Sequence, residues 1–192
     1  ASVKPNLRNP VHLLAFGLGS GCAPKAPGTF GTLAAIPFWW LLLQDTPLIP
    51  YLCVLISGFA FGVYLCEQTS KDLGVHDHGG IVWDEWIGLW ITYIALPAGI
   101  EWIIIGFALF RFFDIIKPWP IKWLDQKVHG GFGIMIDDVL AGIFALICVA
   151  VDEGAVILAK LLFFYGFPCA QVYAAFRFDS VASHSQLKGR FV

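Results

Sequence analysis

The sequence predicts an all-α protein, a multi-pass helical membrane bundle with four or five transmembrane segments, some of them short or kinked. Hydrophobic residues make up 58% of the 192-residue chain, charged residues only 14%, and the mean hydropathy is +0.73. A soluble chain of this length has too much surface to bury so many apolar side chains, so lipid is their expected solvent. Unbroken apolar runs favour helices, because the strands of a membrane barrel would alternate apolar and polar residues.

Five apolar segments follow one another along the chain. The first is shorter than the roughly 20 residues that a membrane helix needs, and Pro37 inside it predicts a kink. The fifth is interrupted at 152–154, so we expect either one crossing or two pieces. The segments cover 29–43, 49–66, 81–97, 102–113 and 138 to about 165. We expect residues 1–170 to form a single membrane-embedded domain and 171–192 to form a polar C-terminal tail of unknown role.

The basic residues of the loops predict the orientation. Lys and Arg residues precede the first segment, lie between the second and third, and follow the fourth, whereas the turns at 44–50 and 97–101 hold none. The positive-inside rule therefore places the N-terminus and the loops 67–82 and 111–137 in the cytoplasm. Nearly all unusual polar residues then lie on one membrane face. The net charge of −2 and the lack of a basic patch argue against a nucleic-acid partner.

Two adjacent acidic pairs, Asp84–Glu85 and Asp137–Asp138, are the strongest chemical signals. Each is expected to open an apolar helix, and Gly88 and Gly142, four residues after an acid, would let two helices approach closely. Carboxylates gathered without balancing cations attract a hard divalent ion, Mg²⁺ above all. Helix capping explains either pair alone equally well. Two costly pairs at one edge of the lipid nevertheless favour a functional site.

Arg111, Asp114 and Lys117 recur every three residues and are expected to form one polar stripe on a helix. The two cations would hold an anionic head group, and Asp114 would add a metal ligand. The alternative is an intrahelical ion pair with a lysine that reaches toward water. Asp125, which follows in the same polar stretch, is interpreted as a solvated loop acid.

The stretch 17–31 is rich in glycine and proline and leads into the first apolar segment. Thr29 is the expected N-cap, Gly28 would let the backbone come close to a ligand, and Lys25 would add charge to a phosphate site at the helix start. An ordinary entry turn explains the pattern as well. His76 and His78, just before the first acidic pair, fit either proton transfer or a polar loop.

The sequence lacks the motifs of three known phosphatase mechanisms. None of the five cysteines has an arginine at the sixth position after it, as a cysteine phosphatase requires. There is also no DxDx[TV] sequence for an aspartyl-phosphate enzyme and no SGH sequence for a histidine nucleophile. Among these phosphatase types, metal-assisted attack by water remains.

Three long blocks together resemble one known family. "APGTFGTLAAIP", "VHDHGGIVWDEWIG" and "FRFFDIIKPWPIKWLD…HGGFGIMIDDVLAG" are similar to the phosphatidylglycerophosphatase A family of bacterial lipid phosphatases, over about residues 10–150. The resemblance implies a Mg²⁺-dependent enzyme of the bacterial inner (cytoplasmic) membrane. Such an enzyme removes the terminal phosphate of phosphatidylglycerol phosphate to give phosphatidylglycerol, and the acids of these blocks would be its working residues.

We therefore expect a phospholipid substrate, a bilayer around the chain and an active site on the cytoplasmic face; the oligomeric state stays open. The alternative is a divalent-cation transporter or channel whose acids bind an ion in transit. The apolar centres of the second and fourth segments argue against a conducting path. Predicted catalytic residues are Asp84, Glu85, Asp137 and Asp138; predicted metal ligands are these four and Asp114; predicted substrate-binding residues are Lys25, Thr29, Arg111 and Lys117.

Overall fold

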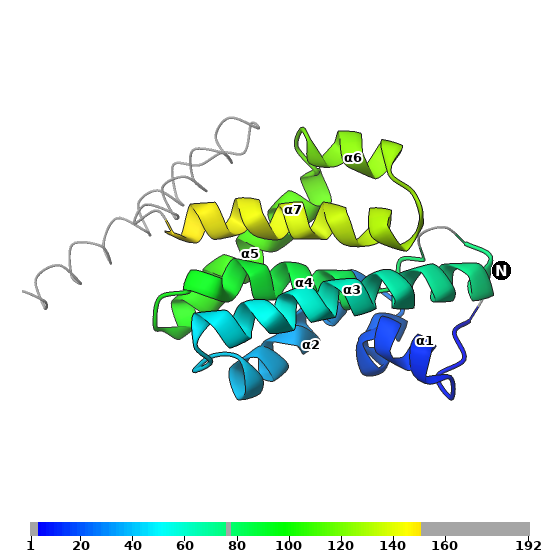
Figure 1. The fold of residues 1–192 in the computed structure, drawn as a ribbon, viewed down its shortest axis with the longest axis horizontal. Coiled ribbons are helices and arrows are strands. Elements are labelled where there is room, and N and C mark those ends of the chain that lie inside the picture. The colour runs from blue at the N-terminus through cyan, green and yellow to red at the C-terminus, as the bar shows by residue number, and fades with distance from the viewer. Residues whose placement is uncertain (1–3, 76–77, 151–192) are drawn as a thin grey trace, which may run out of the picture. The chain divides into compact units, whose positions relative to one another are not determined.

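The computed structural model of the chain describes residues 4–75 and 78–150. Every regular element in these ranges is helical, so the expectation of an all-α fold is confirmed for the described part of the chain. The elements in chain order are α1 (Pro10–Ala15), η1 (Gly17–Cys22), α2 (Pro27–Leu42), α3 (Leu48–Leu73), α4 (Trp83–Thr92), η2 (Tyr93–Ala95), α5 (Ile100–Ile116), α6 (Ile121–Lys127) and α7 (Gly130–Ala150) (Figure 1).

The chain divides into two compact units, Ala1–Ile147 and Cys148–Val192. The expected tail at 171–192, the end of the fifth apolar segment and His76 lie outside the described residues. The expected single domain over 1–170 therefore stays a prediction.

The short helix α4 lies in the middle of the first unit, in contact with α2, α3 and α5 (Figure 1). All its residues after Trp83 are buried. Its tryptophans fix its position, because a buried indole N–H needs an acceptor. Trp86 Nε1 donates to the carbonyl of Gly31 in α2 at 2.9 Å. Trp90 Nε1 donates to Ala35, one turn further along α2, at 3.1 Å.

Helices α4 and α7 cross through their glycines. A Cβ at Gly142 would overlap the carbonyl oxygen of Gly88, and a Cβ at Gly88 would lie 2.7 Å from the carbonyl oxygen of Asp138. The Thr92 hydroxyl also lies 3.3 Å from the carbonyl oxygen of Gly142. The close approach predicted from the spacing of these two glycines is therefore confirmed.

The structure corrects one predicted helix start. Helix α7 begins at Gly130, not at Asp138, so the pair Asp137–Asp138 lies inside the helix rather than at its N-terminus. The α7 start packs on α3: the backbone N–H of Gly131 donates to Glu67 at 2.6 Å, and a Cβ at Gly131 would overlap the carbonyl oxygen of Val63. Capping of an N-terminus therefore cannot explain Asp137 and Asp138.

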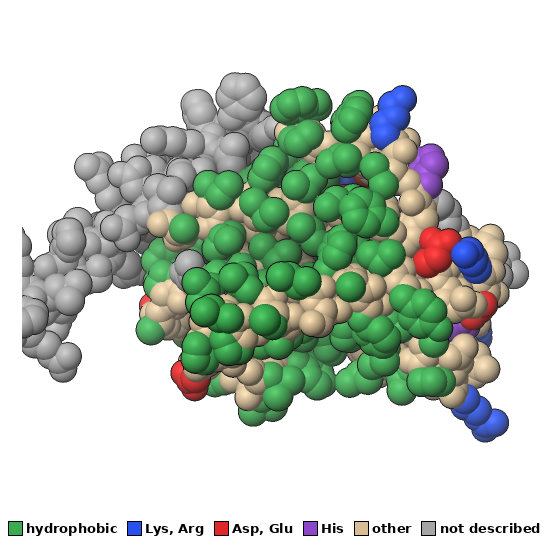
Figure 2. All heavy atoms as spheres, viewed as in Figure 1, with side chains coloured by type: hydrophobic (Ala, Val, Ile, Leu, Met, Phe, Trp, Pro, Cys, Tyr) green, Lys and Arg blue, Asp and Glu red, His purple; other side chains and the backbone are tan. Residues whose placement is uncertain are grey.

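Two helices of the described part, α3 with 26 residues and α7 with 21, are long and apolar enough to cross a membrane. Helices α2 and α5 have 16 and 17 residues, and α4 has only 10. By length and composition alone, these two helices could cross a membrane, and the four or five expected crossings remain a prediction. In Figure 2, hydrophobic side chains cover the middle of the visible face, whereas most charged and His side chains gather toward one end.

The N-terminal elements fix the loop that leads into α4. The backbone N–H of Val82 donates to the carbonyl of Ala15 at 2.9 Å. His12 is buried and its Nε2 lies 3.0 Å from the Asp72 carboxylate at the end of α3, while its Nδ1 accepts the N–H of Asn6 at 3.1 Å. These bonds hold the residues before the first acidic pair in place.

Candidate active site

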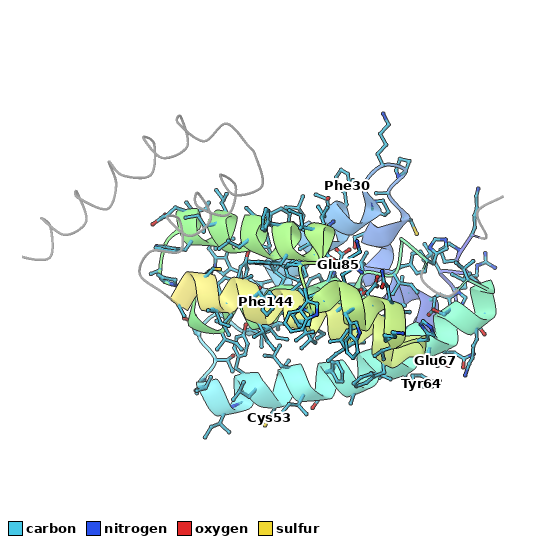
Figure 3. All side chains as sticks on the ribbon, turned by 90° about the horizontal axis from the view of Figure 1, so that it is seen from above. Phe30, Cys53, Tyr64, Glu67, Glu85 and Phe144 are labelled. Carbon is cyan, nitrogen blue, oxygen red and sulfur yellow. The ribbon has the colours of Figure 1, made fainter. Side chains whose placement is uncertain are left out.

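Four buried carboxylates come from two helices that cross. Asp84 and Glu85 lie in the first turn of α4 and are 8% and 9% exposed; Asp137 and Asp138, inside α7, are 6% and 3% exposed. Gly88 and Gly142 lie one turn beyond these acids, so the crossing brings the two pairs to one level. Glu85 lies in the interior of the unit, whereas Glu67 lies at its outer edge beside Tyr64 on α3 (Figure 3).

Asp138 is the deepest of these acids. The carboxylates of Asp114, Asp84, Asp137 and Glu85 all lie close enough to repel a negative charge on the Asp138 carboxylate. Acids from α4, α5 and α7 therefore share one electrostatic environment. Burial of like charges is unfavourable unless a cation or a proton compensates them.

Arg111 on α5 connects two of the acids. Its Nη1 lies 3.1 Å from the Glu85 carboxylate and 2.5 Å from the Asp114 carboxylate, and all three side chains are at least 85% buried. The ion pair of Arg111 with Asp114 on one helix, which the sequence offered as the alternative to a head-group and metal site, is present, and the contact with Glu85 adds a link between helices. The Arg111 Nε is buried and has no hydrogen-bond partner among the described residues. A buried guanidinium N–H without an acceptor is costly, so this donor has a hydrogen bond left to make.

Lys117 ends α5 and turns toward α7. It has a left-handed backbone conformation with φ of +46°, which is unusual for a residue other than glycine. Its Nζ lies 2.5 Å from the Asp137 carboxylate and 2.8 Å from that of Asp125. Burial lowers the pKa of Lys117, but the charges and hydrogen bonds of Asp137 and Asp125 outweigh that effect and raise the pKa above its usual value. Lys117 is therefore a fixed positive charge at the edge of the acid cluster.

Asp125 is exposed, as expected, but the interpretation as a loop acid is wrong, because it lies in α6 and pairs with Lys117. Lys117 itself does not continue the stripe of Arg111 and Asp114 along α5. The αL turn at its own position ends the helix and redirects the side chain. The three-residue spacing therefore places Arg111 and Asp114 together on α5, but it does not give the position of Lys117.

The start of α2 closes the site on a third side. A Cβ at Gly28 would overlap the Glu85 carboxylate and lie 3.2 Å from Nη2 of Arg111, so only glycine fits here without displacement. The Thr32 hydroxyl contacts the other Glu85 oxygen and lies 2.9 Å from the Gly28 carbonyl. The backbone of the "APGT" stretch thus touches the acid cluster directly.

Two predicted residues of this stretch take other places. The N-cap of α2 is Ala26, in a left-handed conformation, and not Thr29; the prediction of Thr29 as N-cap was wrong because Pro27 already starts the helix. Lys25 is exposed and, like Thr29, does not join the hydrogen bonds described above. Thr32 contacts Glu85 but was not among the residues predicted for the site. A threonine inside an apolar helix ordinarily bonds its own backbone, so the sequence carried no signal for the contact with Glu85.

The carboxylates of the cluster are candidate ligands for a metal ion. Within the described ranges, no three His, Cys, Asp or Glu side chains are arranged as a ready metal site. Mg²⁺, however, commonly uses one or two carboxylates and completes its shell with water and substrate phosphate. Five acids, Asp84, Glu85, Asp114, Asp137 and Asp138, share this region with two cations: Arg111 pairs with Glu85 and Asp114, and Lys117 pairs with Asp137. This surplus of hard oxygen ligands fits such an ion.

Comparisons with known proteins show the family. Residues 13–153 match the family model described as Phosphatidylglycerophosphatase A. The chain belongs to this family. It is 56% identical over 146 residues to Phosphatidylglycerophosphatase A of Escherichia coli (strain K12), which covers 76% of this chain and 84% of that protein. It is 52% identical over 147 residues to the protein of the same name from Haemophilus influenzae, covering 76% and 90%.

Membership in the phosphatidylglycerophosphatase A family confirms the prediction of a phosphatase. The matched residues include every helix that contributes to the acid cluster, from α2 to α7, and exclude the expected tail. No solved structure matches the chain.

Proposed function

We propose that the chain is a Mg²⁺-dependent lipid phosphatase that hydrolyses phosphatidylglycerol phosphate to phosphatidylglycerol and inorganic phosphate. Its relatives' names give the reaction. The observation that carries the chemistry is the buried acid cluster, in which Glu85 and Asp114 pair with Arg111, and the Arg111 Nε still lacks an acceptor among the described residues. A phosphate oxygen is the natural acceptor for this N–H. A transporter has no supporting observation in the comparisons.

The phosphate would lie between Arg111, Lys117 and the start of α2. Helix α2 has no side-chain cap, and its first turn would offer an anion the backbone N–H groups of Gly28 and Thr29, since Pro27 has none and that of Phe30 donates to Ala26. Gly28 keeps this backbone close to Arg111. Arg111 would orient the phosphate through a planar fork, and Lys117 would add charge from the α7 side.

The acids would bind the cation and accept a proton from the attacking water. Asp84, Glu85, Asp137 and Asp138, with Asp114 beside them, would hold Mg²⁺ through one or two carboxylates. When bound, this ion supplies charge to polarise the phosphoryl group. In hydrolysis, a water oxygen forms a bond to phosphorus, the P–O bond to the glycerol breaks, and the glycerol oxygen takes a proton. A carboxylate of the cluster is the group placed to accept the proton that the water loses.

The membrane setting follows from the substrate and from the surface. A phospholipid keeps its acyl chains in the bilayer, so the enzyme needs to reach only the head group. We propose that α3 and α7 cross the bacterial inner membrane, supported by their length and apolar composition. The charged end of the unit in Figure 2 would face the cytoplasm, in agreement with the basic loops.

One assay tests the reaction. The purified full chain is given phosphatidylglycerol phosphate with Mg²⁺ or with a chelator, and inorganic phosphate is measured. We expect release that needs the metal, and a loss of about 100-fold or more for Asp84→Asn and Asp138→Asn. Asp45→Asn is the matched control, because Asp45 is exposed in the turn between α2 and α3. Metal-independent release would remove Mg²⁺ from the proposal, and full activity in both site variants would remove these acids.

A further inference from the structure

Helix α6 packs only a small part of its surface against the other described helices. Ile121 is its only buried residue, and the side chains after it are exposed or half-buried. In Figure 1, it lies at the top of the view, above α7 and apart from the packed helices. A seven-residue helix is far too short to cross a bilayer.

Large apolar side chains are exposed on α6 and on the residues just before it. Trp119 is 82% exposed, Trp123 is 53% exposed, and Ile115 at the end of α5 is 68% exposed. Leaving such side chains in water is unfavourable by about 25 cal/mol per Å² of apolar area. Phe132, near the start of the candidate membrane helix α7, is also 47% exposed.

The same surface carries positive charge. Lys122 and Lys127 are exposed on α6, between and beyond the tryptophans. Figure 2 shows hydrophobic side chains projecting at the position of α6, with a Lys or Arg side chain next to them. Tryptophan prefers the head-group level of a bilayer, and lysines near that level attract anionic lipids. Aromatic and basic side chains together therefore fit an anionic lipid surface better than another protein.

This surface is connected to the acid cluster. Lys117 bridges Asp125 of α6, at 2.8 Å, and Asp137 of α7, at 2.5 Å. The position of α6 therefore fixes the position of the cation at the edge of the cluster. An anchor at the head-group level would hold the site at the depth where a lipid-borne phosphate lies.

We propose that α6 is an interfacial anchor: Trp119 and Trp123 enter the head-group layer of an anionic bilayer, Lys122 and Lys127 bind its lipid head groups, and the bridge through Lys117 sets the depth of the site. The proposal deepens the proposed function, because it states how the same site reaches a phosphate carried by a lipid. The occupant of the surface is the bilayer and not a second copy of the chain.

The first test needs no enzymatic activity. The full chain is reconstituted in vesicles that contain phosphatidylglycerol and lipids brominated either near the head group or near the chain ends. The chain has eight tryptophans, so the contribution of these two is the fluorescence difference between the wild type and W119Q/W123Q. We expect that difference to be quenched mainly by the shallow bromines. Quenching mainly by an aqueous quencher, or by the deep bromines, would overturn the proposal.

The second test uses the reaction. W119Q/W123Q and K122Q/K127Q should release phosphate several-fold more slowly from long-chain substrate in vesicles, yet at wild-type rate from a short-chain soluble analogue. K4Q/R8Q is the charge-matched control on the exposed N-terminal segment and should behave as wild type in both assays. Equal loss on both substrates would contradict an anchoring role.

Two further results would distinguish failure of the anchor proposal from failure of the proposed function. If W119Q/W123Q converted a dimer into a monomer in detergent, the surface would be an interface between copies and the lipid proposal would be wrong. If no variant and no wild type released phosphate, the proposed function would fail, while the quenching result would still decide whether α6 lies in the head-group layer.

Discussion

Arg111 of α5 and Glu85 of α4 form an ion pair at 3.1 Å directly against the backbone of Gly28 at the start of α2. Three helices that are distant in the sequence therefore meet at one guanidinium group. Two consequences follow, one for the side chain and one for the glycine.

Arg111→Lys should lower kcat/KM for phosphate release by about 100-fold, although the charge is kept. A lysine has no planar fork, so it cannot bridge Glu85 and Asp114 and also offer the free N–H of Nε to a phosphate. Steady-state kinetics with separate kcat and KM measure the effect. Arg8→Lys, on the exposed N-terminal segment, is the control. Wild-type kinetics in Arg111→Lys would mean that only charge matters here.

Gly28→Ala should reduce activity strongly and lower stability by about 1–3 kcal/mol, the range for overpacking a filled site. The added Cβ would overlap the Glu85 carboxylate and press on the Arg111 guanidinium. Gly79→Ala is the matched control, since a Cβ there meets nothing within 4 Å. Phosphate release and thermal unfolding of both variants provide the comparison; equal behaviour of the two would show that the α2 start has room to move.

Gly142→Ala should destabilise the fold by about 1–3 kcal/mol and reduce activity together with it. Its Cβ would overlap the Gly88 carbonyl oxygen, and a backbone atom inside a packed helix cannot rotate away. The crossing would then open and the acids of α4 and α7 would separate. Ile147→Ala, at a position that is 55% exposed on the same helix, should change stability much less. Denaturant or thermal unfolding in detergent measures both; an unchanged Gly142→Ala variant would contradict a tight crossing.

Much of this arrangement was predictable from local patterns. Long apolar runs predicted helices, and the equal spacing of Asp84 to Gly88 and of Asp138 to Gly142 predicted a crossing that gathers acids. These features work because helix period and small-residue packing depend on residues only four apart.

The rest depended on contacts between distant segments. The glycines before Phe132 are typical of a loop, yet they begin α7, because Gly131 packs on the Val63 carbonyl and Glu67 accepts its N–H. Thr32 and Glu85 are 53 residues apart in the chain. Neither contact leaves a pattern in the local sequence, so helix starts and the partners of single polar side chains were the features that only the structure revealed.

Lys117 should matter for stability through Asp137 much more than through Asp125. The Asp137 carboxylate is buried and would lose its cation in Lys117→Gln, whereas Asp125 is exposed. Because the lysine is itself partly exposed, we discount the full cost of breaking a buried pair and expect a loss of about 1–3 kcal/mol. Asp125→Asn removes an exposed pair and should cost less than about 1 kcal/mol.

A double-mutant cycle separates the pair from other effects of Lys117. Combining Lys117→Gln with Asp137→Asn removes both charges, so the double variant should be less destabilised than the sum of the single variants. Unfolding free energies of the wild type, both single variants and the double variant give the coupling directly. Strict additivity would mean that the contact at 2.5 Å contributes nothing to the fold, and Lys117 would then act only on the substrate.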